Sequence, residues 1–331
     1  MTERKPRVGF LGTGWIGRHR MAAMVASGAV DAVAVGDPSP EMVAEATGVA
    51  PEAVACASLA EMLALGLDGV VIATPSALHA AQSIAALEAG VAVFCQKPLG
   101  RDAAETAAVV EAARRADRLL GVDLSYRHTA GMRAIAPLVQ GGALGRVFAI
   151  DLTFHNAYGP DKPWFYDRAQ SGGGCVMDLG IHLADLALWL NPGAEVAGVD
   201  AALYAAGGPV GAEAVEDYAA ASVRLDNGVT VRLACSWRLH AGQDAVIEAA
   251  FYGTEGGAAL RNVAGSFYDF TAEHFRGTAR ETLAVPPDDW GGRAAVDWAT
   301  RLAGGARFDA GAGEHVATAR VLDAIYAAGR K

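Results

Sequence analysis

The chain has 331 residues, of which 52% are hydrophobic and 19% are charged, and its formal net charge is −10 at pH 7. This length predicts two domains. The high hydrophobic and low charged content predicts a large apolar core and argues against a mainly disordered chain. The acidic balance argues against nucleic acid or an anionic membrane as a partner, and no apolar run reaches the roughly 18 residues of a membrane span. The start carries no signal-peptide pattern, and the four cysteines have neither zinc spacing nor a disulfide framework, so we expect a cytoplasmic protein without a metal site.

The first predicted strand, residues 7–11, runs directly into a glycine-rich turn and then into a helix. The turn has the G-x-G-x-x-G spacing of a dinucleotide-binding site. We expect Gly12 to allow the tight turn, Gly14 to let the backbone approach a pyrophosphate, and Gly17 to let the helix pack on the strand. The helix N-terminus then offers N–H groups and partial positive charge to the phosphates. The turn residues assigned to cofactor binding are Gly12, Gly14, Trp15, Ile16 and Gly17.

A second predicted strand, residues 31–37, ends in Asp37, at the distance beyond Gly17 where a ribose-binding carboxylate is expected. Asp37 would accept hydrogen bonds from the adenosine ribose and repel a 2′-phosphate. No arginine follows it, so we expect NAD in preference to NADP. The simpler alternatives are an ordinary strand–turn–helix and a turn-initiating aspartate before Pro38.

Strands and helices then alternate, which predicts βαβ units and a parallel sheet. The further strands are expected at 67–74, 91–96 and 119–124, and the helices at 41–47, 59–65, 77–89 and 102–117. Ligands of such sheets bind where the carboxyl ends of the strands meet. The residues assigned to the cofactor site near these ends are Thr74, Pro75, His79, Gln96 and Lys97.

The pattern changes near residue 125, which divides the chain into a dinucleotide-binding domain (1–124) and a substrate-binding and oligomerisation domain (125–331). The second domain is predicted to contain helices at 132–139, 178–190, 296–302 and 314–328, and strands at 146–154, 196–205, 215–226, 229–238 and 245–253. Asp226-Asn227-Gly228 is a strong hairpin signal. Antiparallel strands with one open face predict an α+β domain.

Lys97 stands directly after a predicted core strand and before Pro98, which places its charge at the mouth of the cofactor cleft. A lysine in such a place can donate a hydrogen bond to a reacting oxygen. The alternative is a solvated loop lysine.

A glycine-rich segment, residues 172–185, carries a second group of polar residues. Its three glycines would let the backbone approach a ligand. Asp178 and His182 are expected on one face of a buried helix, with Asp185 placed to orient the histidine. Because imidazole titrates at about pH 6.5, it can exchange a proton with an alcohol as hydride leaves. The alternative is a structural, hydrogen-bonded pair.

Further residues are expected beside the cleft. Tyr126 and Arg127 follow the last strand of the parallel sheet and would line the cleft or bridge the domains. Aromatic residues of the loop at 158–166 can stack on a sugar ring or form an apolar lid. The residues predicted to contact substrate are Tyr126, Arg127, Tyr158, Trp164, Asp178 and His182.

Taken together, these motifs resemble the Gfo/Idh/MocA superfamily, which includes glucose–fructose oxidoreductase and inositol dehydrogenase. The resemblance covers nearly the whole chain. It implies an α/β protein with an N-terminal Rossmann domain (a doubly wound parallel sheet) and a C-terminal α+β domain with a large, open, mainly antiparallel sheet. The exposed face of that sheet commonly mediates homodimers or homotetramers. The matching motifs are Thr74-Pro75-Ser76-x-x-His79, Lys97-Pro98-Leu99, Gly172-Gly173-Gly174, Asp178-x-Gly180-x-His182-x-x-Asp185, Glu216-Asp217-Tyr218 and Ser236-Trp237.

The resemblance also implies a catalytic lysine, aspartate and histidine, which correspond to Lys97, Asp178 and His182. The lysine would hydrogen-bond the reacting oxygen, the histidine would act as acid or base, and the aspartate would position the histidine or the substrate. One departure is Gln96 in place of the usual glutamate before Lys97, which removes a neighbouring negative charge.

We therefore expect an NAD(H)-dependent oxidoreductase that transfers hydride to or from a secondary hydroxyl or ketone of a sugar, sugar derivative or cyclitol. The ammonium of Lys97 and the imidazole of His182 should then converge on one face of the nicotinamide. Two alternatives stay open. One is an enzyme with tightly bound, recycled NAD that catalyses redox-assisted epimerisation, elimination or glycoside cleavage. The other is a non-catalytic NAD(H)-binding sensor.

Overall fold

The structure is a computed structural model that describes residues 4–330. Its internal contacts divide the chain into two units: the described part of Met1–Ser125 together with Gly291–Val316, and Tyr126–Trp290 together with the described residues from Ala317 onward. The sequence-based division assigned the whole of 125–331 to the second domain, and it therefore placed residues 291–316 differently. Among the described residues, none of the helices combines the length and the hydropathy that crossing a membrane requires.

The first unit is built on a six-stranded sheet in the order β3-β2-β1-β4-β5-β6. Every neighbouring pair is parallel. The order reverses between β1 and β4, which is where a doubly wound sheet binds ligands beyond its carboxyl edge. The strands are β1 (Arg7–Leu11), β2 (Asp31–Gly36), β3 (Val54–Ala55), β4 (Gly69–Ile72), β5 (Ala92–Cys95) and β6 (Leu120–Val122).

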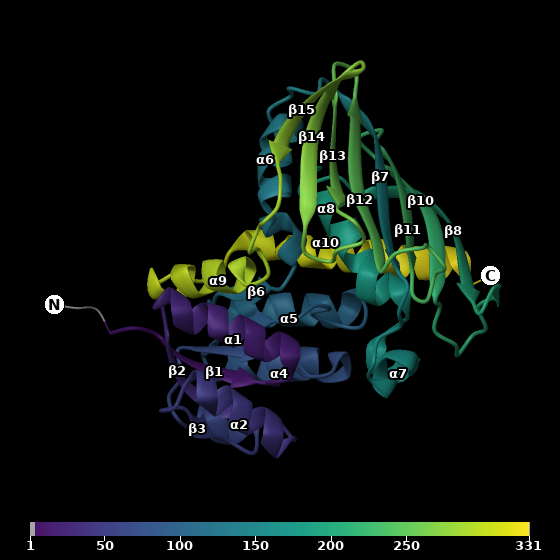
Figure 1. The fold of residues 1–331 in the computed structure, drawn as a ribbon. Helices are drawn as coiled ribbons and strands as arrows, with labels where there is room; N and C mark the ends of the chain where they lie inside the picture. The colour runs from purple at the N-terminus through teal and green to yellow at the C-terminus, as the bar shows by residue number, and fades with distance from the viewer. Residues whose placement is uncertain (1–3, 331) are drawn as a thin grey trace. The chain divides into compact units, whose positions relative to one another are not determined.

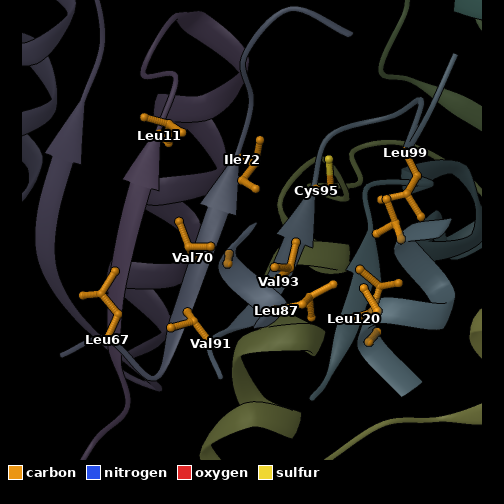
Figure 2. Close-up of a cluster of buried hydrophobic side chains, with 14 of the residues drawn as sticks. Leu11, Leu67, Val70, Ile72, Leu87, Val91, Val93, Cys95, Leu99 and Leu120 are labelled. Carbon is orange, nitrogen blue, oxygen red and sulfur yellow. The ribbon is translucent and has the colours of Figure 1, made fainter. Parts of the chain in front are cut away.

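Helices cover both faces of this sheet because its strands are apolar on both sides. Val70 and Ile72 point into one apolar cluster, together with side chains of α3, α4 and α5 (Figure 2). Val71 points into the other cluster, with side chains of α1, α2 and α9. The helices are α1 (Trp15–Ser27), α2 (Pro40–Val49), α3 (Leu59–Leu63), α4 (Ser76–Glu88), α5 (Ala103–Ala116) and α9 (Arg293–Ala303).

The second unit is built on a nine-stranded sheet in the order β15-β14-β13-β12-β7-β11-β10-β8-β9 (Figure 1). The pairing of β7 with β11 is parallel, and the other pairings are antiparallel. The predicted mainly antiparallel sheet is confirmed. The strands are β7 (Val147–Asn156), β8 (Val196–Ala205), β9 (Gly208–Pro209), β10 (Tyr218–Leu225), β11 (Thr230–Ser236), β12 (Ala245–Gly253), β13 (Gly257–Asn262), β14 (Phe270–Arg276) and β15 (Ala279–Ala284).

Helices pack on one face of the second sheet. α6 contacts β13, β14 and β15, and α8 contacts β7 and β11. Along β10 buried residues alternate with half-buried ones, as expected for a sheet with one solvated face. The remaining helical segments are α6 (Ala130–Gln140), α7 (Arg168–Ser171), α8 (Ile181–Trp189), α10 (Gly313–Gly329), the π-helical turn η3 (Val176–Gly180), and the short 3₁₀ turns η1 (Ser125–His128), η2 (Pro163–Tyr166) and η4 (Ala310–Ala312).

The predicted hairpin at Asp226-Asn227-Gly228 is confirmed. β10 and β11 pair in antiparallel register from Tyr218 opposite Ser236 to Arg224 opposite Thr230. Gly228 adopts φ = 86°, a left-handed conformation that glycine tolerates best.

Candidate functional site

The glycine-rich turn between β1 and α1 is shaped by contacts within the first unit. Gly12 has φ = 83°, and a Cβ on it would lie 2.5 Å from the backbone of Ala73. A Cβ on Gly17 would lie 2.0 Å from the carbonyl oxygen of Gly12. Within the described chain, a Cβ on Gly14 would meet no atom within 4 Å. Packing therefore requires the outer two glycines, whereas Gly14 borders open space.

The N-terminus of helix α1 lies at Gly14, beside this open space. Gly14 is its N-cap residue and supplies no side-chain hydrogen bond, and the first turn of the helix carries no acidic residue. The N–H groups at such an end have no intrahelical acceptors, and the helix dipole adds partial positive charge. The turn therefore fits the pyrophosphate of a dinucleotide.

Asp37 directly follows β2 and holds the glycine-rich turn. Its Oδ2 accepts a hydrogen bond from the backbone N–H of Thr13 (2.8 Å), and its Oδ1 accepts one from the N–H of Ser39 (2.9 Å). Each carboxylate oxygen can accept more than one hydrogen bond, so the half-buried side chain keeps acceptor capacity for ribose hydroxyls.

Arg18, on α1, lies beside the same turn, and sequence reasoning missed it. Its Nη1 is 3.5 Å from the carbonyl oxygen of Thr13 and 3.7 Å from Sδ of Met42, and its guanidinium forms an ion pair with Glu45. A phosphate-binding arginine would be expected after Asp37, whereas Arg18 comes from the helix that follows the glycines.

His79, on α4, joins the loops that follow β4 and β5. Its side chain is buried, its Nε2 lies 2.6 Å from the carbonyl oxygen of Thr74, and its Nδ1 lies 2.6 Å from that of Pro98. Burial lowers the pKa of His79, and the positive charge of Lys97 lowers it further. The two carbonyl oxygens raise this pKa, but by less. In this structure His79, predicted to bind cofactor, contacts the two loops that follow β4 and β5.

We expect the free energy of unfolding to fall as the pH is lowered below 6.5, the ordinary pKa of histidine. The folded-state pKa is lowered, so the unfolded chain binds more protons there and is favoured. Urea unfolding between about pH 7.5 and about pH 5.5 measures this slope. In His79→Asn the slope should be shallower, and an unchanged slope would show that His79 does not contribute.

Gln96 stands where the motif that precedes Lys97 usually has glutamate. Its side-chain amide has two hydrogen-bond partners. Oε1 accepts a hydrogen bond from the backbone N–H of Lys97 (2.9 Å), and Nε2 donates one to Oδ2 of Asp123 (2.9 Å). Asp123 is buried and also accepts a hydrogen bond from Nε of Arg20 (2.6 Å). An amide suits this position because one end must accept and the other must donate. A glutamate would place a second carboxylate against Asp123.

Gln96→Glu is therefore expected to lower the free energy of unfolding at neutral pH by about 1–3 kcal/mol, because a carboxylate at this half-buried position would lie against the buried carboxylate of Asp123. The deficit should shrink at about pH 5, where one carboxyl can hold a proton. Denaturant unfolding at both pH values measures the effect. Gln170→Glu, at an exposed position, is the matched control. Equal stability of Gln96→Glu and the parent at neutral pH would contradict the argument.

Asp178 lies within a π-helical turn, and α8 begins only at Ile181. The predicted regular helix across Asp178 and His182, with the spacing of one α-helical face, is therefore wrong. A π-helical turn holds an extra residue, and such turns recur at functional sites. The turn is bonded to distant parts of the chain, which a local pattern cannot predict.

Trp237, just after β11, contacts Asp178. Its buried indole Nε1 donates a hydrogen bond to Oδ2 of Asp178 (3.0 Å). The rings of Phe165 and Tyr166 lie edge-on to the indole, at centroid distances of 6.3 and 5.6 Å, and Trp164 stacks on Phe165 at 3.8 Å. The predicted aromatic loop thus packs against the tryptophan that binds Asp178. The sequence motifs include Trp237, but the predicted strand at 229–238 contains it, so its contact with Asp178 was not predicted.

His182, on α8, lies among aromatic side chains. Its ring centroid is 5.0 Å from that of Tyr126 and 6.3 Å from that of Phe154. All three residues border a small apolar cavity. Burial raises the pKa of Tyr126, so its hydroxyl stays protonated. The structure therefore brings together two of the predicted substrate residues.

Two further predicted residues have strong partners. Nε and Nη2 of Arg127 donate to the two carboxylate oxygens of Asp185 at 2.8 and 2.5 Å, and the guanidinium lies over the ring of Trp189. Asp185, predicted to orient the histidine, is thus part of a bidentate ion pair. Tyr158 is exposed, and its hydroxyl donates to Oδ1 of Asp244 (2.6 Å).

The predicted catalytic residues belong to different units. Lys97 lies in the first unit, and Asp178 and His182 lie in the second. Their predicted convergence on a nicotinamide stays a prediction. Among residues 4–330, the structure contains no group of three or more His, Cys, Asp or Glu side chains arranged to hold a metal ion.

Two protein-family models match the chain. One, described as the oxidoreductase family with an NAD-binding Rossmann fold, matches residues 6–124, and the other, the GFO/IDH/MocA C-terminal domain, matches residues 132–259. The chain belongs to the Gfo/Idh/MocA oxidoreductase family. The resemblance seen in the motifs is thereby confirmed.

Curated relatives agree with this assignment. A 1,5-anhydro-D-fructose reductase of Ensifer adhaerens is 34% identical over 60% of this chain, and the match spans only 58% of that protein. A provisionally named UDP-kanosamine synthase oxidoreductase subunit of Amycolatopsis mediterranei is 32% identical over 72% of this chain and 70% of that protein. A levoglucosan dehydrogenase solved in complex with NADH has the same fold, with a TM-score of 0.84 over 98% of this chain and 97% of that chain at 22% identity.

Proposed function

We propose that this protein is an NAD(H)-dependent oxidoreductase that acts on a secondary hydroxyl or ketone of a sugar, sugar derivative or cyclitol. The observation that carries the proposal is the open helix N-terminus at Gly14 beside the carboxylate of Asp37, in a chain of an oxidoreductase family. The curated relatives named above support the substrate class, because the first is a reductase of an anhydro sugar.

The residues of the first unit would hold the cofactor. Gly12 and Gly17 would shape the turn, the pyrophosphate would approach at Gly14, and Asp37 would bind the adenosine ribose. We propose NAD in preference to NADP, because Asp37 repels a 2′-phosphate and Glu45 already neutralises Arg18. When bound, the nicotinamide supplies hydride acceptance or delivery.

The proton chemistry would fall to side chains of both units. Lys97 would donate a hydrogen bond to the reacting oxygen and stabilise negative charge on it. His182 would take the hydroxyl proton during oxidation and return it during reduction. Asp178 would orient the substrate or the histidine, and the indole of Trp237 holds one of its oxygens in place.

The substrate would bind beside the aromatic loop. Trp164 and Tyr166 are partly exposed and would offer flat apolar faces, which suit the CH-rich face of a sugar ring. Tyr126, Arg127 and Tyr158, which also lie in the second unit, would be near the substrate. Arg127 would then share or exchange its ion pair with Asp185, and Tyr158 its hydrogen bond to Asp244.

The open face of the nine-stranded sheet is our proposed homodimer or homotetramer interface. Ala202, Ala220 and Ala234 lie side by side on this face in register, so a second sheet could approach closely. Ion pairs join neighbouring strands around them, between Arg224 and Asp200, and between Arg232 and Asp151. Sedimentation of the purified protein would test this, and a monomer at micromolar concentration would contradict it.

The activity test uses purified protein with NAD⁺ or NADH and a panel containing levoglucosan, 1,5-anhydro-D-fructose, myo-inositol and common aldoses. We expect a change of NADH absorbance that depends on one carbohydrate. Substrate loss without such a change, with NAD that copurifies, would select the recycled-cofactor alternative. Nucleotide binding without turnover of any panel member would favour the sensor alternative.

A further inference from the structure

The buried carboxylate of Glu216 contacts the start of the helical segment that contains Asp178. Glu216 is 0% exposed. Its Oε1 accepts hydrogen bonds from the backbone N–H groups of Gly174 (2.9 Å) and Val176 (3.0 Å). Its own backbone carbonyl accepts one from the N–H of Cys175 (2.9 Å). One residue, distant in sequence, thus binds three consecutive N–H groups.

These N–H groups open the π-helical turn and the helix behind it, and a helix offers them no internal acceptor. The negative charge of a carboxylate also interacts favourably with the positive end of the helix dipole. Glu216 therefore serves as an N-cap supplied from outside the helix. The helix start is satisfied by the protein and is not an anion site.

The glycines of this segment make room for that cap. A Cβ on Gly174 would lie 1.9 Å from the carbonyl oxygen of Glu216, and a Cβ on Gly173 would lie 1.8 Å from the hydroxyl of Tyr326. The sequence predicted that these glycines admit a ligand. In the structure, other parts of the protein occupy the space beside both of them.

The C-terminal helical segment holds Glu216 from the other side. The hydroxyl of Tyr326 donates to Oε1 (2.9 Å), and Nη2 of Arg330 lies 3.5 Å from Oε2. Arg330 also donates to the carbonyl oxygens of Ala212 (2.9 Å) and Ala214 (3.1 Å), just before Glu216. Burial raises the pKa of Glu216, whereas these donors and Arg330 act against the rise.

The turn and the residue before it also contact β11 and Trp237, the residue after β11. The N–H of Asp178 bonds to the carbonyl oxygen of Gly174 (3.0 Å), and the carboxylate of Asp178 accepts from Trp237 (3.0 Å). Sγ of Cys175 lies 3.4 Å from the carbonyl oxygen of Cys235. A shift at Gly174 would therefore move Asp178 relative to Trp237.

We propose that Glu216 is a positioning residue: by capping the helix start at Gly174–Val176, it sets the place of the Asp178 carboxylate against the indole of Trp237. The effect on catalysis rests on the proposed function. Misplacement of a reacting group by about 1 Å can cost about 100-fold in rate.

The test measures the chemical shift of the Trp237 indole N–H by NMR of protein labelled with ¹⁵N-tryptophan. The resonance is assigned by its loss in Trp237→Phe. Asp178→Ala defines its position without the carboxylate. Glu216→Ala should move the resonance toward that position and lower kcat by about 100-fold on the best substrate of the carbohydrate panel, with KM changed less. Glu216→Gln keeps an oxygen that can accept from both N–H groups. Its Trp237 resonance and its kcat should therefore lie close to those of the parent. Glu213→Gln, exposed in the same segment, should match the parent.

A folded Glu216→Ala protein with the Trp237 resonance and kcat of the parent would overturn the proposal. Should Glu216→Ala not fold, Tyr326→Phe decides, because it removes one donor to Oε1. A shift toward the Asp178→Ala position supports positioning, and an unmoved resonance overturns it. If the parent converts no carbohydrate, the proposed function fails, while the resonance still decides the role of Glu216.

Discussion

Lys97→Ala and His182→Ala are each expected to lower kcat by about 100- to 10,000-fold, the range that a positioned acid or base contributes. Lys97 follows β5 at the carboxyl edge of the parallel sheet, and its backbone N–H is held by Gln96. His182 lies on α8 among buried aromatic rings. His182 is not assigned to the cofactor site, so in His182→Ala the Kd for NADH should change by less than about threefold, well under 1 kcal/mol. Lys97 is assigned to the cofactor site as well, so its variant is judged by kcat at saturating NADH.

Initial rates from NADH absorbance and Kd values from NADH fluorescence separate these two effects. Lys5→Ala and His240→Ala, at exposed positions, are the matched controls. If both active-site variants bind NADH and keep kcat within about tenfold of the parent, the loss is too small for acid–base catalysis. That result would contradict the proposed mechanism.

Asp37→Ala is expected to weaken NADH binding by about 10- to 100-fold, which corresponds to the loss of one or two hydrogen bonds to a charged acceptor. The variant removes the acceptor for the ribose, and it also releases the backbone N–H of Thr13. Because the repelling charge is gone, NADPH should lose less affinity than NADH.

Combining Asp37→Ser with Glu45→Gln should go further and favour NADPH over NADH. Arg18 would then be released from its ion pair beside Thr13, where a guanidinium can bind a phosphate in bidentate fashion. Fluorescence titrations with both reduced cofactors measure the ratio of Kd values, and Glu41→Gln, an exposed acid on the same helix as Glu45, is the control. An unchanged ratio in the double variant would show that Asp37 and Glu45 do not select the cofactor.

Much of the first unit could be predicted because its signals are local. β1, β2, β4 and β5 are continuous apolar runs that end in turn residues, and the glycine motif follows one of them directly. β3 was missed because Val54 and Ala55 are too short a run and are both exposed. In the second unit, β13 was missed because Gly257–Asn262 begins with small residues, which show no alternation of apolar and polar side chains.

The residues of the candidate site were easier to name than their partners. The pairing of Gln96 with Asp123, of Asp178 with Trp237, and of Gly174 with Glu216 each joins positions far apart in the chain. Such contacts depend on tertiary packing, which no spacing within one segment encodes. The π-helical turn is of the same kind, since its bonds to Glu216 and Trp237 come from two other elements.

The parallel pairing of β7 with β11 has a consequence for how specificity can diversify. Because both strands run the same way, with Ser236 opposite His155, the chain leaves them at one edge of the sheet. The aromatic loop after β7 and Trp237 after β11 therefore emerge as neighbours. Insertions or exchanges within residues 157–171 would remodel the surroundings of Asp178 without disturbing the ladder of either strand. Directed evolution aimed at a new carbohydrate would have its most tolerant target in that loop.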